Sequence, residues 1–257
     1  MPPRAASVLL ICQLTFIHRV QCLCPAGFTD VGDGVCMFIT AQYATYCQAH
    51  EYCEKEGIAR GLRLFLPSRH AENMTKLLPD GGGAFTGLTK LLVKSATDLT
   101  AGWRYSDPGW SWFATSPGDT TIRWQKNQVS TEAESIGLYA APNLWDVTQF
   151  AFPATHVICE LSTYITNTTN DPLQLDWPYS MSTMFLPDAQ NEGCFTSFNV
   201  SSLFDCCGNC RSRSACRAFY YHLETAKCWI SLYVDSLLPS SLKATGGTWW
   251  RFGRPKW

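Results

Sequence analysis

The distribution of cysteines is the feature that most constrains how this chain can fold. The sequence has 257 residues and 13 cysteines, which beyond residue 22 form two blocks. The first block contains Cys24, Cys36, Cys47, Cys53 and, after a long gap, Cys159. The second contains Cys194, Cys206, Cys207, Cys210, Cys216 and Cys228. Cysteine-rich chains of this kind are typical of oxidising compartments, so the spacing predicts two disulfide-stapled modules.

The N-terminal segment has the organisation of a secretion signal. A basic residue at Arg4 precedes an apolar run from Ala5 to Ile17, and small residues lie near Cys22. We therefore predict a signal peptide over residues 1–22, cleaved after Cys22. The run is shorter than the roughly 20 residues that cross a bilayer, and no later segment is long and apolar enough. The sequence predicts a secreted, extracellular protein without a membrane span.

Glycosylation and charge agree with a secretory route. Three sequons place candidate glycans on Asn73, Asn167 and Asn199. The formal net charge is −1, and no clustered basic face is present. We therefore expect no nucleic-acid partner.

Local patterns in the first module predict a mixed α+β fold. Asp33-Gly34 is a hairpin turn signal, and a disulfide between Cys24 and Cys36 would clip that hairpin. Residues 42–56 lack Gly and Pro and predict a helix that ends at Gly57, and residues 68–78 predict a second helix. Cys47 and Cys53 would lie about 9 Å apart along the first helix and about 120° apart around it, so they cannot bond to each other.

Residues 23–162 resemble the long-form C-type lectin-like domain. The motifs that carry the resemblance occur in the family's order: the Cys24 hairpin, Ala49-x-x-x-Cys53-x-x-x-Gly57, Phe85-Thr-Gly-Leu88, Trp145-Asp-Val147 and Val157-Ile-Cys-Glu160. The resemblance implies a disulfide between Cys53 and Cys159. It also implies a loop region that binds calcium and sugar in many members.

The calcium motif of that family is degraded in this chain. Gln128-Val129-Ser130 stands where the family has Glu-Pro-Asn or Gln-Pro-Asp, and Trp145-Asp146 replaces an Asn-Asp pair. The family's second disulfide is also absent. Calcium prefers six to eight oxygen ligands, several of them charged. We therefore expect no cofactor, with a rearranged calcium site built from Glu132, Glu134, Asn143 and Asp146 as the alternative.

Aromatic residues in the same region are the candidate ligand-binding groups. Such side chains can stack on sugar rings or fill a pocket of a protein partner, although packing within the module is the alternative role. The predicted ligand-binding set is Trp110, Trp112, Trp124, Gln128, Asn143 and Asp146.

A Thr- and Asn-rich stretch over residues 163–175 predicts a linker, followed by a second module over residues 176–257. The second module resembles the PAN/apple domain, which has a helix clamped onto a small sheet. The residues that match its pattern in order are Cys206, Cys210, Cys216, Phe219, Tyr221 and Cys228. The resemblance implies the pairs Cys206–Cys228 and Cys210–Cys216, and we add Cys194–Cys207 as a fifth pair.

The cysteine count leaves one thiol without a partner. Removal of Cys12 and Cys22 with the signal leaves eleven cysteines, an odd number. We expect Cys47 to be the unpaired one, which would let it bridge two copies as a disulfide-linked homodimer. Cys207-Gly-Asn-Cys210 also fits a redox motif, or a zinc site with His222, but an oxidising compartment favours structural disulfides.

Function is predicted at the level of class. The chain lacks His-Glu-x-x-His, Gly-x-Ser-x-Gly and Gly-rich phosphate-binding motifs, so we expect no enzymatic activity. We predict a secreted, non-catalytic binding protein that recognises an extracellular glycan or protein without calcium. The alternative is a calcium-dependent carbohydrate-binding lectin with a rearranged site.

Overall fold

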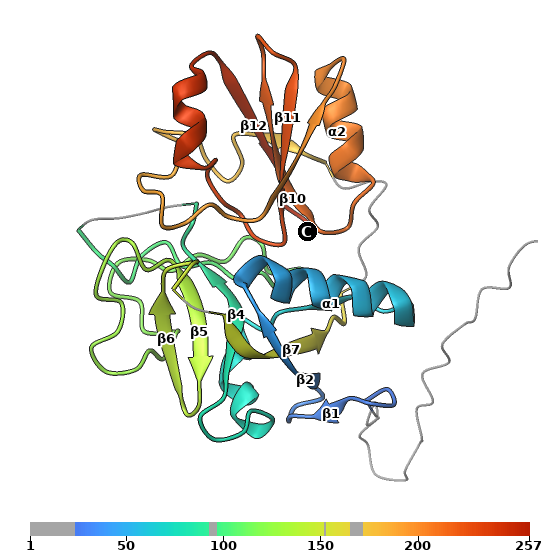
Figure 1. The fold of residues 1–257 in the computed structure, drawn as a ribbon, viewed down its shortest axis with the longest axis vertical. Coiled ribbons are helices and arrows are strands. Elements are labelled where there is room, and N and C mark those ends of the chain that lie inside the picture. Colours follow the sequence, from blue (N-terminus) through green and yellow to red (C-terminus); the bar gives the residue numbers. More distant parts are fainter. Residues whose placement is uncertain (1–23, 93–96, 152, 165–171) are drawn as a thin grey trace, which may run out of the picture.

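The computed structural model describes residues 24–92, 97–151, 153–164 and 172–257 (Figure 1). The expected signal peptide, Asn167 and the central part of the expected linker lie outside the described residues. Two sheets with few helices form the described part, so the predicted α+β, disulfide-stapled fold class is confirmed.

The first module is built on a seven-stranded sheet with the order β1-β2-β7-β4-β5-β6, in which β3 also pairs with β7. Most pairs are antiparallel, whereas β4 meets β7 in parallel. The last strand of the module therefore returns to its first strands. The elements are β1 (Thr29–Asp30), β2 (Cys36–Ala44), α1 (Tyr46–Arg60), β3 (Leu64–Phe65), η1 (Ala71–Lys76), β4 (Gly83–Thr89), β5 (Ile136–Ala140), β6 (Asn143–Val147) and β7 (Ala154–Leu161).

Helix α1 differs from the helix expected over residues 42–56. It begins after Thr45, whose side chain forms a reciprocal capping box with Gln48, and it ends at Gly61 in the left-handed conformation (φ 65°). Gly57 lies inside the helix, where the missing side chain makes room for the returning chain: a Cβ there would be 2.8 Å from the carbonyl oxygen of Leu62. The predicted end at Gly57 was therefore wrong.

The helix expected over residues 68–78 is shorter than predicted. The structure has only the 3-10 helix η1, which begins after His70. The Ser68 hydroxyl donates to the Asp107 carboxylate and accepts from Ser106 N (3.0 Å), so it does not cap a helix. Long-range contacts thus replace the expected N-terminal turn.

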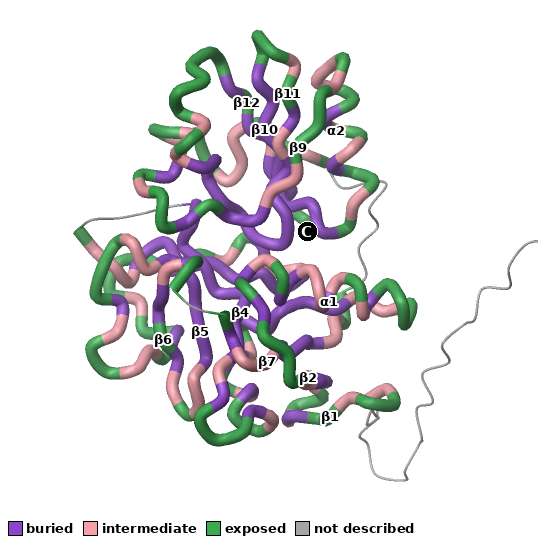
Figure 2. The backbone as a smooth tube through the Cα atoms, viewed as in Figure 1, coloured by how far each residue is buried: buried purple, intermediate pink, exposed green. Residues whose placement is uncertain are grey.

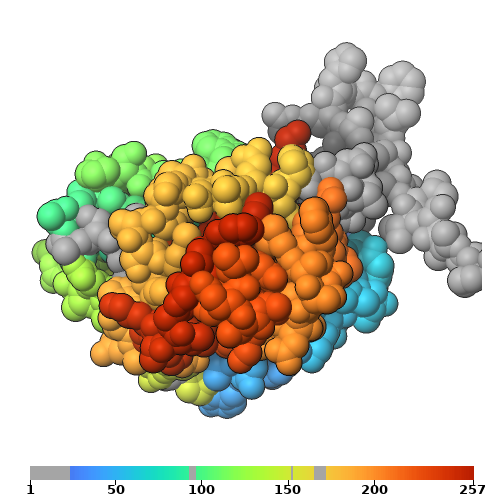
Figure 3. Space-filling model, turned by 90° about the horizontal axis from the view of Figure 1, so that it is seen from above, coloured from blue at the N-terminus to red at the C-terminus, as the bar shows by residue number. Residues whose placement is uncertain are grey.

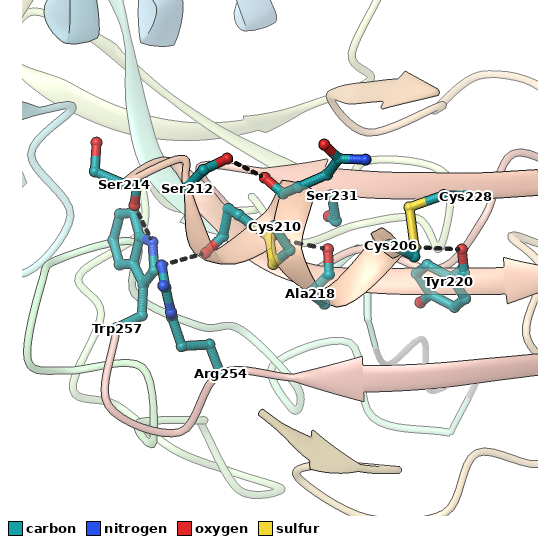
Figure 4. Close-up of a disulfide and its surroundings, with 12 residues drawn as sticks. Cys206, Cys210, Ser212, Ser214, Ala218, Tyr220, Cys228, Ser231, Arg254 and Trp257 are labelled. Atoms are coloured by element: carbon teal, nitrogen blue, oxygen red, sulfur yellow. Dashed lines mark hydrogen bonds between the residues drawn. A yellow bond between two sulfur atoms is a disulfide. The ribbon is translucent and has the colours of Figure 1, made fainter. Parts of the chain in front are cut away.

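The second module has a five-stranded sheet with the order β8-β12-β10-β11-β9. Helix α2 packs on β10, and the Cys206–Cys228 disulfide joins it to β11 (Figure 4). β8 lies within residues 163–175, the range expected as linker, and pairs with β12 of the second sheet. The elements are β8 (Gln174–Leu175), β9 (Phe195–Asn199), α2 (Leu203–Arg211), β10 (Cys216–His222), β11 (Lys227–Leu232), η2 (Ser240–Thr245) and β12 (Trp249–Gly253).

Five disulfides are present among the described residues. Four are the pairs expected from the sequence: Cys24–Cys36, Cys53–Cys159, Cys206–Cys228 and Cys210–Cys216. The fifth pairing was predicted incorrectly, because Cys194 is bonded to Cys47 of α1. Cys207 is consequently the free cysteine within the described ranges, and Cys47 is not available to bridge two copies.

Cys47–Cys194 crosses the boundary between modules that pack closely together. One continuous core contains buried residues of both sheets, including Phe85 and Ile136 of the first and Phe219 and Ile230 of the second. Figure 2 shows buried residues, in purple, concentrated at this junction. Seen from above, the second module, in orange and red, covers the first (Figure 3).

A buried carboxylate organises the charges at the junction. Asp235 of the second module accepts from Arg217 (2.6 Å) and Arg251 (3.0 Å), and Arg104 of the first module lies 3.7 Å away. Burial opposes ionisation of Asp235, but these three guanidinium groups outweigh it and hold its pKa below the ordinary value. The Asp235 carboxylate therefore compensates buried arginine charges from both modules.

Helix α1 supplies a second set of polar contacts to the junction. Glu54 accepts from Arg213 (3.1 Å) and from the Tyr233 hydroxyl (2.6 Å). His50, one turn earlier, stacks on the Tyr233 ring with a centroid distance of 5.0 Å. His50 is 3% exposed, and burial lowers its pKa to about 3.

The inter-module disulfide should contribute strongly to stability. Cys47 and Cys194 are separated by 147 residues, so their bond closes a long loop in the unfolded chain. We expect the double substitution Cys47→Ser/Cys194→Ser to lower the free energy of unfolding by about 2–4 kcal/mol in denaturant titrations. Cys207→Ser is the matched control and should change it by less than about 0.5 kcal/mol. Non-reducing peptide mapping that linked Cys194 to Cys207 would contradict the pairing.

His50 should make folding sensitive to acid. Between pH 6.5 and about 3 the unfolded chain binds a proton at this histidine and the folded chain does not, so stability falls as the pH falls through this window. The slope from this one group reaches about 1.4 kcal/mol per pH unit. We expect His50→Phe, which keeps a ring against Tyr233, to flatten the pH dependence of the unfolding free energy. Parallel curves for both proteins would show that His50 is not responsible.

Candidate functional site

The predicted calcium-type residues of strand β6 do not converge on one point. Successive side chains of a strand point to opposite faces, so Asn143 and Asp146 lie on opposite sides of the sheet and about 10 Å apart along it. Asn143 pairs with Ala140 at the hairpin end, whereas Asp146 pairs with Gly137. The strand geometry therefore separates two of the predicted ligands.

Asp146 has a structural role in the observed conformation. It is 2% exposed, and its Oδ1 accepts from the backbone N–H of Val129 at 2.7 Å. Burial raises the pKa of Asp146, an effect that this hydrogen bond opposes. Val129 has a φ of 63°, a costly conformation for a β-branched residue, and Asp146 holds its N–H there.

The other candidate ligands of this loop also have local partners. Gln128 donates its backbone N–H to Gln125 (2.9 Å), and its side chain is half-buried. The Glu134 carboxylate accepts from the hydroxyls of Ser130 (3.2 Å) and Thr131 (3.1 Å). Glu132 is exposed. Within the described residues these carboxylates are not gathered around one centre, and the buried Oδ2 of Asp146 has no hydrogen-bond partner.

The three predicted tryptophans fall into two environments. Trp124 packs against the buried Trp103 ring at a centroid distance of 4.4 Å, so it belongs to the module's second core cluster. Trp110 and Trp112 lie together, with ring centroids 5.3 Å apart, and Trp112 is 63% exposed. Trp110 and Trp112 therefore form the accessible part of the predicted aromatic set.

The second module holds the loop that carries these two rings. Gly109 N donates to the backbone oxygen of Trp257 at 2.6 Å, and the Ser111 hydroxyl donates to that of Pro255 at 2.5 Å. Trp257 is fixed in turn between the guanidinium groups of Arg63 (4.6 Å) and Arg217 (4.5 Å). Figure 4 shows its indole N–H directed at the Ser214 carbonyl.

A cluster of ionisable groups lies beside Trp110. One ligand atom from each of His70, Asp107 and Glu160 lies within 4.8 Å of the others, a set that could hold a metal ion. In the structure His70 Nδ1 is 2.7 Å from Glu160 Oε1, and Nε2 accepts from Arg69. Burial, and next the Glu160 charge, raise the pKa of Asp107 to about 7.

Sequence reasoning missed this cluster as a candidate site. His70 and Glu160 are separated by 90 residues, and Asp107 comes from a third segment. Such separations carry no motif, and Glu160 was noted only as part of the closing strand. The one indication was that the closing strand, β7, returns to the start of the module, which brings Glu160 to His70.

A cleft of about 540 Å³ also runs along the junction beside Cys47–Cys194. Its lining includes the half-exposed Phe150, Trp229 and the carboxylates of Glu51 and Glu192. The Gln149 amide in its wall is already engaged: Oε1 accepts from Gly193 N at 2.8 Å. The cleft is a second concave surface, formed only when both modules are in place.

Comparison with known proteins gives matches among solved structures only. No protein-family model matches the sequence, and no curated protein does. Similar solved structures include the C-type lectin CEL-I from Cucumaria echinata, with 19% identity, a TM-score of 0.39, and coverage of 55% of this chain and 99% of that one. The cow C-type carbohydrate-recognition domain of CD23, in the presence of an oligosaccharide, has 16% identity, a TM-score of 0.38, and coverage of 55% and 98%. A calcium-independent type II antifreeze protein has 19% identity, a TM-score of 0.35, and coverage of 54% and 93%.

No helix of the described residues has the length and apolar character needed to cross a membrane.

Substitution of Asp146 should separate a structural role from a metal-binding role. Asp146→Asn keeps an oxygen acceptor for Val129 N–H and removes a buried charge, so the unfolding free energy should stay within about 1 kcal/mol of the wild type. Asp146→Ala leaves the Val129 N–H unpaired and should cost about 1–3 kcal/mol. Thermal and denaturant unfolding with and without calcium check this. Calcium-dependent stabilisation that both variants lose would identify Asp146 as a ligand instead.

Proposed function

We propose that this chain is a secreted, non-catalytic binding protein that recognises an extracellular glycan or protein without calcium. The observation that carries the proposal is the Trp110–Trp112 pair, an exposed aromatic surface on a loop fixed by both modules. Exposed aromatic rings on a rigid support lose little conformational entropy on binding and contribute much of the affinity.

The module assignment belongs to the same proposal. The motif order and the Cys24–Cys36 and Cys53–Cys159 pairs support a C-type lectin-like first module. The α2 helix clamped onto a small sheet by two disulfides supports a PAN/apple-like second module. The many disulfides support secretion, and Asn199 on β9 is exposed and Asn73 half-buried, as candidate glycan sites.

The positions of the loop residues support independence from calcium. Asp146 Oδ1 accepts from Val129 N–H while its Oδ2 has no partner within the described residues, and Asn143 points to the opposite face of β6. Too few charged oxygens remain at one point for a tight calcium shell. The alternative is a calcium-dependent lectin with a rearranged site, for which the half-exposed or exposed Glu132, Glu134 and Asn143 would be the ligands.

Ligand capture should depend on Trp112 and be insensitive to chelator. A combined glycan and extracellular-protein array, probed with the full chain with and without EDTA, should give the same hits. Trp112→Ala should weaken capture by about tenfold or more, the usual effect of losing a central aromatic contact. Trp250→Ala, which removes a partly exposed tryptophan from the second module (39% exposed, against 63% for Trp112), is the matched control.

Two results would contradict the proposal. Capture that EDTA abolishes, together with a calcium isotherm, would support the rearranged lectin. Capture that survives Trp112→Ala unchanged would place the binding surface elsewhere on the molecule.

A further inference from the structure

A small cavity adjoins the Trp110–Trp112 loop. Its volume is about 170 Å³, enough for the end of one side chain, and far more than a single ion occupies. The β1–β2 turn, the start of the η1 segment, the loop before Trp110 and the end of β7 form its walls. Its lining includes Asp33, Asp107, Trp110, Glu160 and Tyr164.

Glu160, which lines the cavity, has a buried acceptor atom without a donor. Glu160 is 5% exposed, and its Oε1 contacts His70 Nδ1 at 2.7 Å. Its Oε2 has no hydrogen-bond partner within the described part of the chain. A buried carboxylate oxygen without a donor is energetically costly. A ligand that supplied a hydrogen-bond donor would remove this cost.

Asp107 adds a second carboxylate to the same wall. It is 3% exposed and accepts from the Ser68 hydroxyl and from the backbone N–H of Arg69 (3.3 Å). A carboxylate can accept further hydrogen bonds beyond these. Two buried carboxylates facing one small cavity favour a positively charged occupant.

Arg69 shows how a cation sits at the rim of this cavity. Its guanidinium carbon lies 4.4 Å from the centroid of the Trp110 ring, and its Nη2 contacts His70 Nε2 at 2.9 Å. The Arg69 side chain is exposed, so it can move aside. The chain's own arginine therefore occupies the aromatic surface that an incoming cation would use.

We propose that this cavity binds the ammonium or guanidinium end of a lysine or arginine side chain presented by a protein partner. The charged group donates to Glu160 Oε2 and to the Asp107 carboxylate, and the alkyl stem lies against Trp110 and Tyr164. Arg69 acts as a tethered competitor for the Trp110 face. This inference rests on the proposed binding function and names the chemistry of the partner.

A metal ion fits the observed geometry less well. Both ring nitrogens of His70 are already hydrogen-bonded, and the three candidate ligand atoms spread over up to 4.8 Å. Ligand atoms around a tetrahedral zinc ion are only about 3.4 Å apart. An alkylammonium group uses the unpartnered oxygen without rearranging the histidine.

The test uses the full chain and two small probes that differ in one charge. Nα-acetyl-lysinamide carries the free ε-ammonium group, and the same molecule acetylated on Nε does not. Titration followed by tryptophan fluorescence and by NMR should show saturable binding of the first probe only. Glu160→Gln, which keeps the shape and the contact to His70, should weaken binding by about tenfold or more.

Two further variants make the result specific. Glu72→Gln is the matched control, because Glu72 is an exposed acid near the site that does not line the cavity; its binding should equal that of the wild type. Arg69→Ala removes the competitor while keeping the backbone N–H to Asp107, so it should tighten binding. If Arg69 had only a structural role, Arg69→Ala would not increase the affinity for the probe.

The proposal is overturned if the two probes bind equally, if Glu160→Gln leaves binding unchanged, or if Arg69→Ala weakens it. It is also overturned if zinc or calcium, but not the amine, binds in a Glu160-dependent manner. Array capture that needs Trp112 while the charged probe does not bind would leave the proposed function standing and reject this inference alone.

Discussion

The ion pairs of the Asp235 carboxylate are the interactions on which the arrangement of the molecule depends. A single buried negative charge accepts from Arg217 and Arg251 of its own module and attracts Arg104 of the other. Loss of that carboxylate would leave three buried guanidinium groups without compensation, which costs more than any one of the contacts contributes. Arg104 also donates to the Ser111 carbonyl at 2.6 Å, so the charge cluster connects directly to the aromatic loop.

Helix α1 completes this connection from the other side of the junction. One part of the helix packs against its own sheet through Tyr46 and Cys53, whereas Cys47, His50 and Glu54 face the second module. At the junction Glu54 is paired with Arg213 and Tyr233, whereas the buried Nε2 of His50 has no hydrogen-bond partner within the described residues. The two modules therefore behave as one packed body joined by a shared core.

Much of this fold could be predicted from local sequence, because hairpin signals, capping residues and family-like cysteine spacings act over short ranges. Cys24–Cys36 and Cys210–Cys216 are examples. The Cys47–Cys194 bond could not be predicted, since 147 residues separate the two cysteines and no local pattern connects positions so far apart. The predicted helix end at Gly57 was wrong for a related reason. The small size of Gly57 accommodates the close return of the chain at Leu62 and does not mark the end of the helix. Trp112 could be named from the aromatic-rich sequence as a candidate binding residue, with its exposure left open, but the cluster of His70, Asp107 and Glu160 arises only from tertiary structure.

The tie between Gly109 and Trp257 has a consequence for how the two modules influence each other. The support of the aromatic loop comes from residues 255–257, which follow β12 of the second module, so displacement of this tail would break two hydrogen bonds that hold the loop. Where such coupling exists, it is reciprocal: an effector on the second module that alters affinity at the loop is itself bound more tightly or weakly by the same factor.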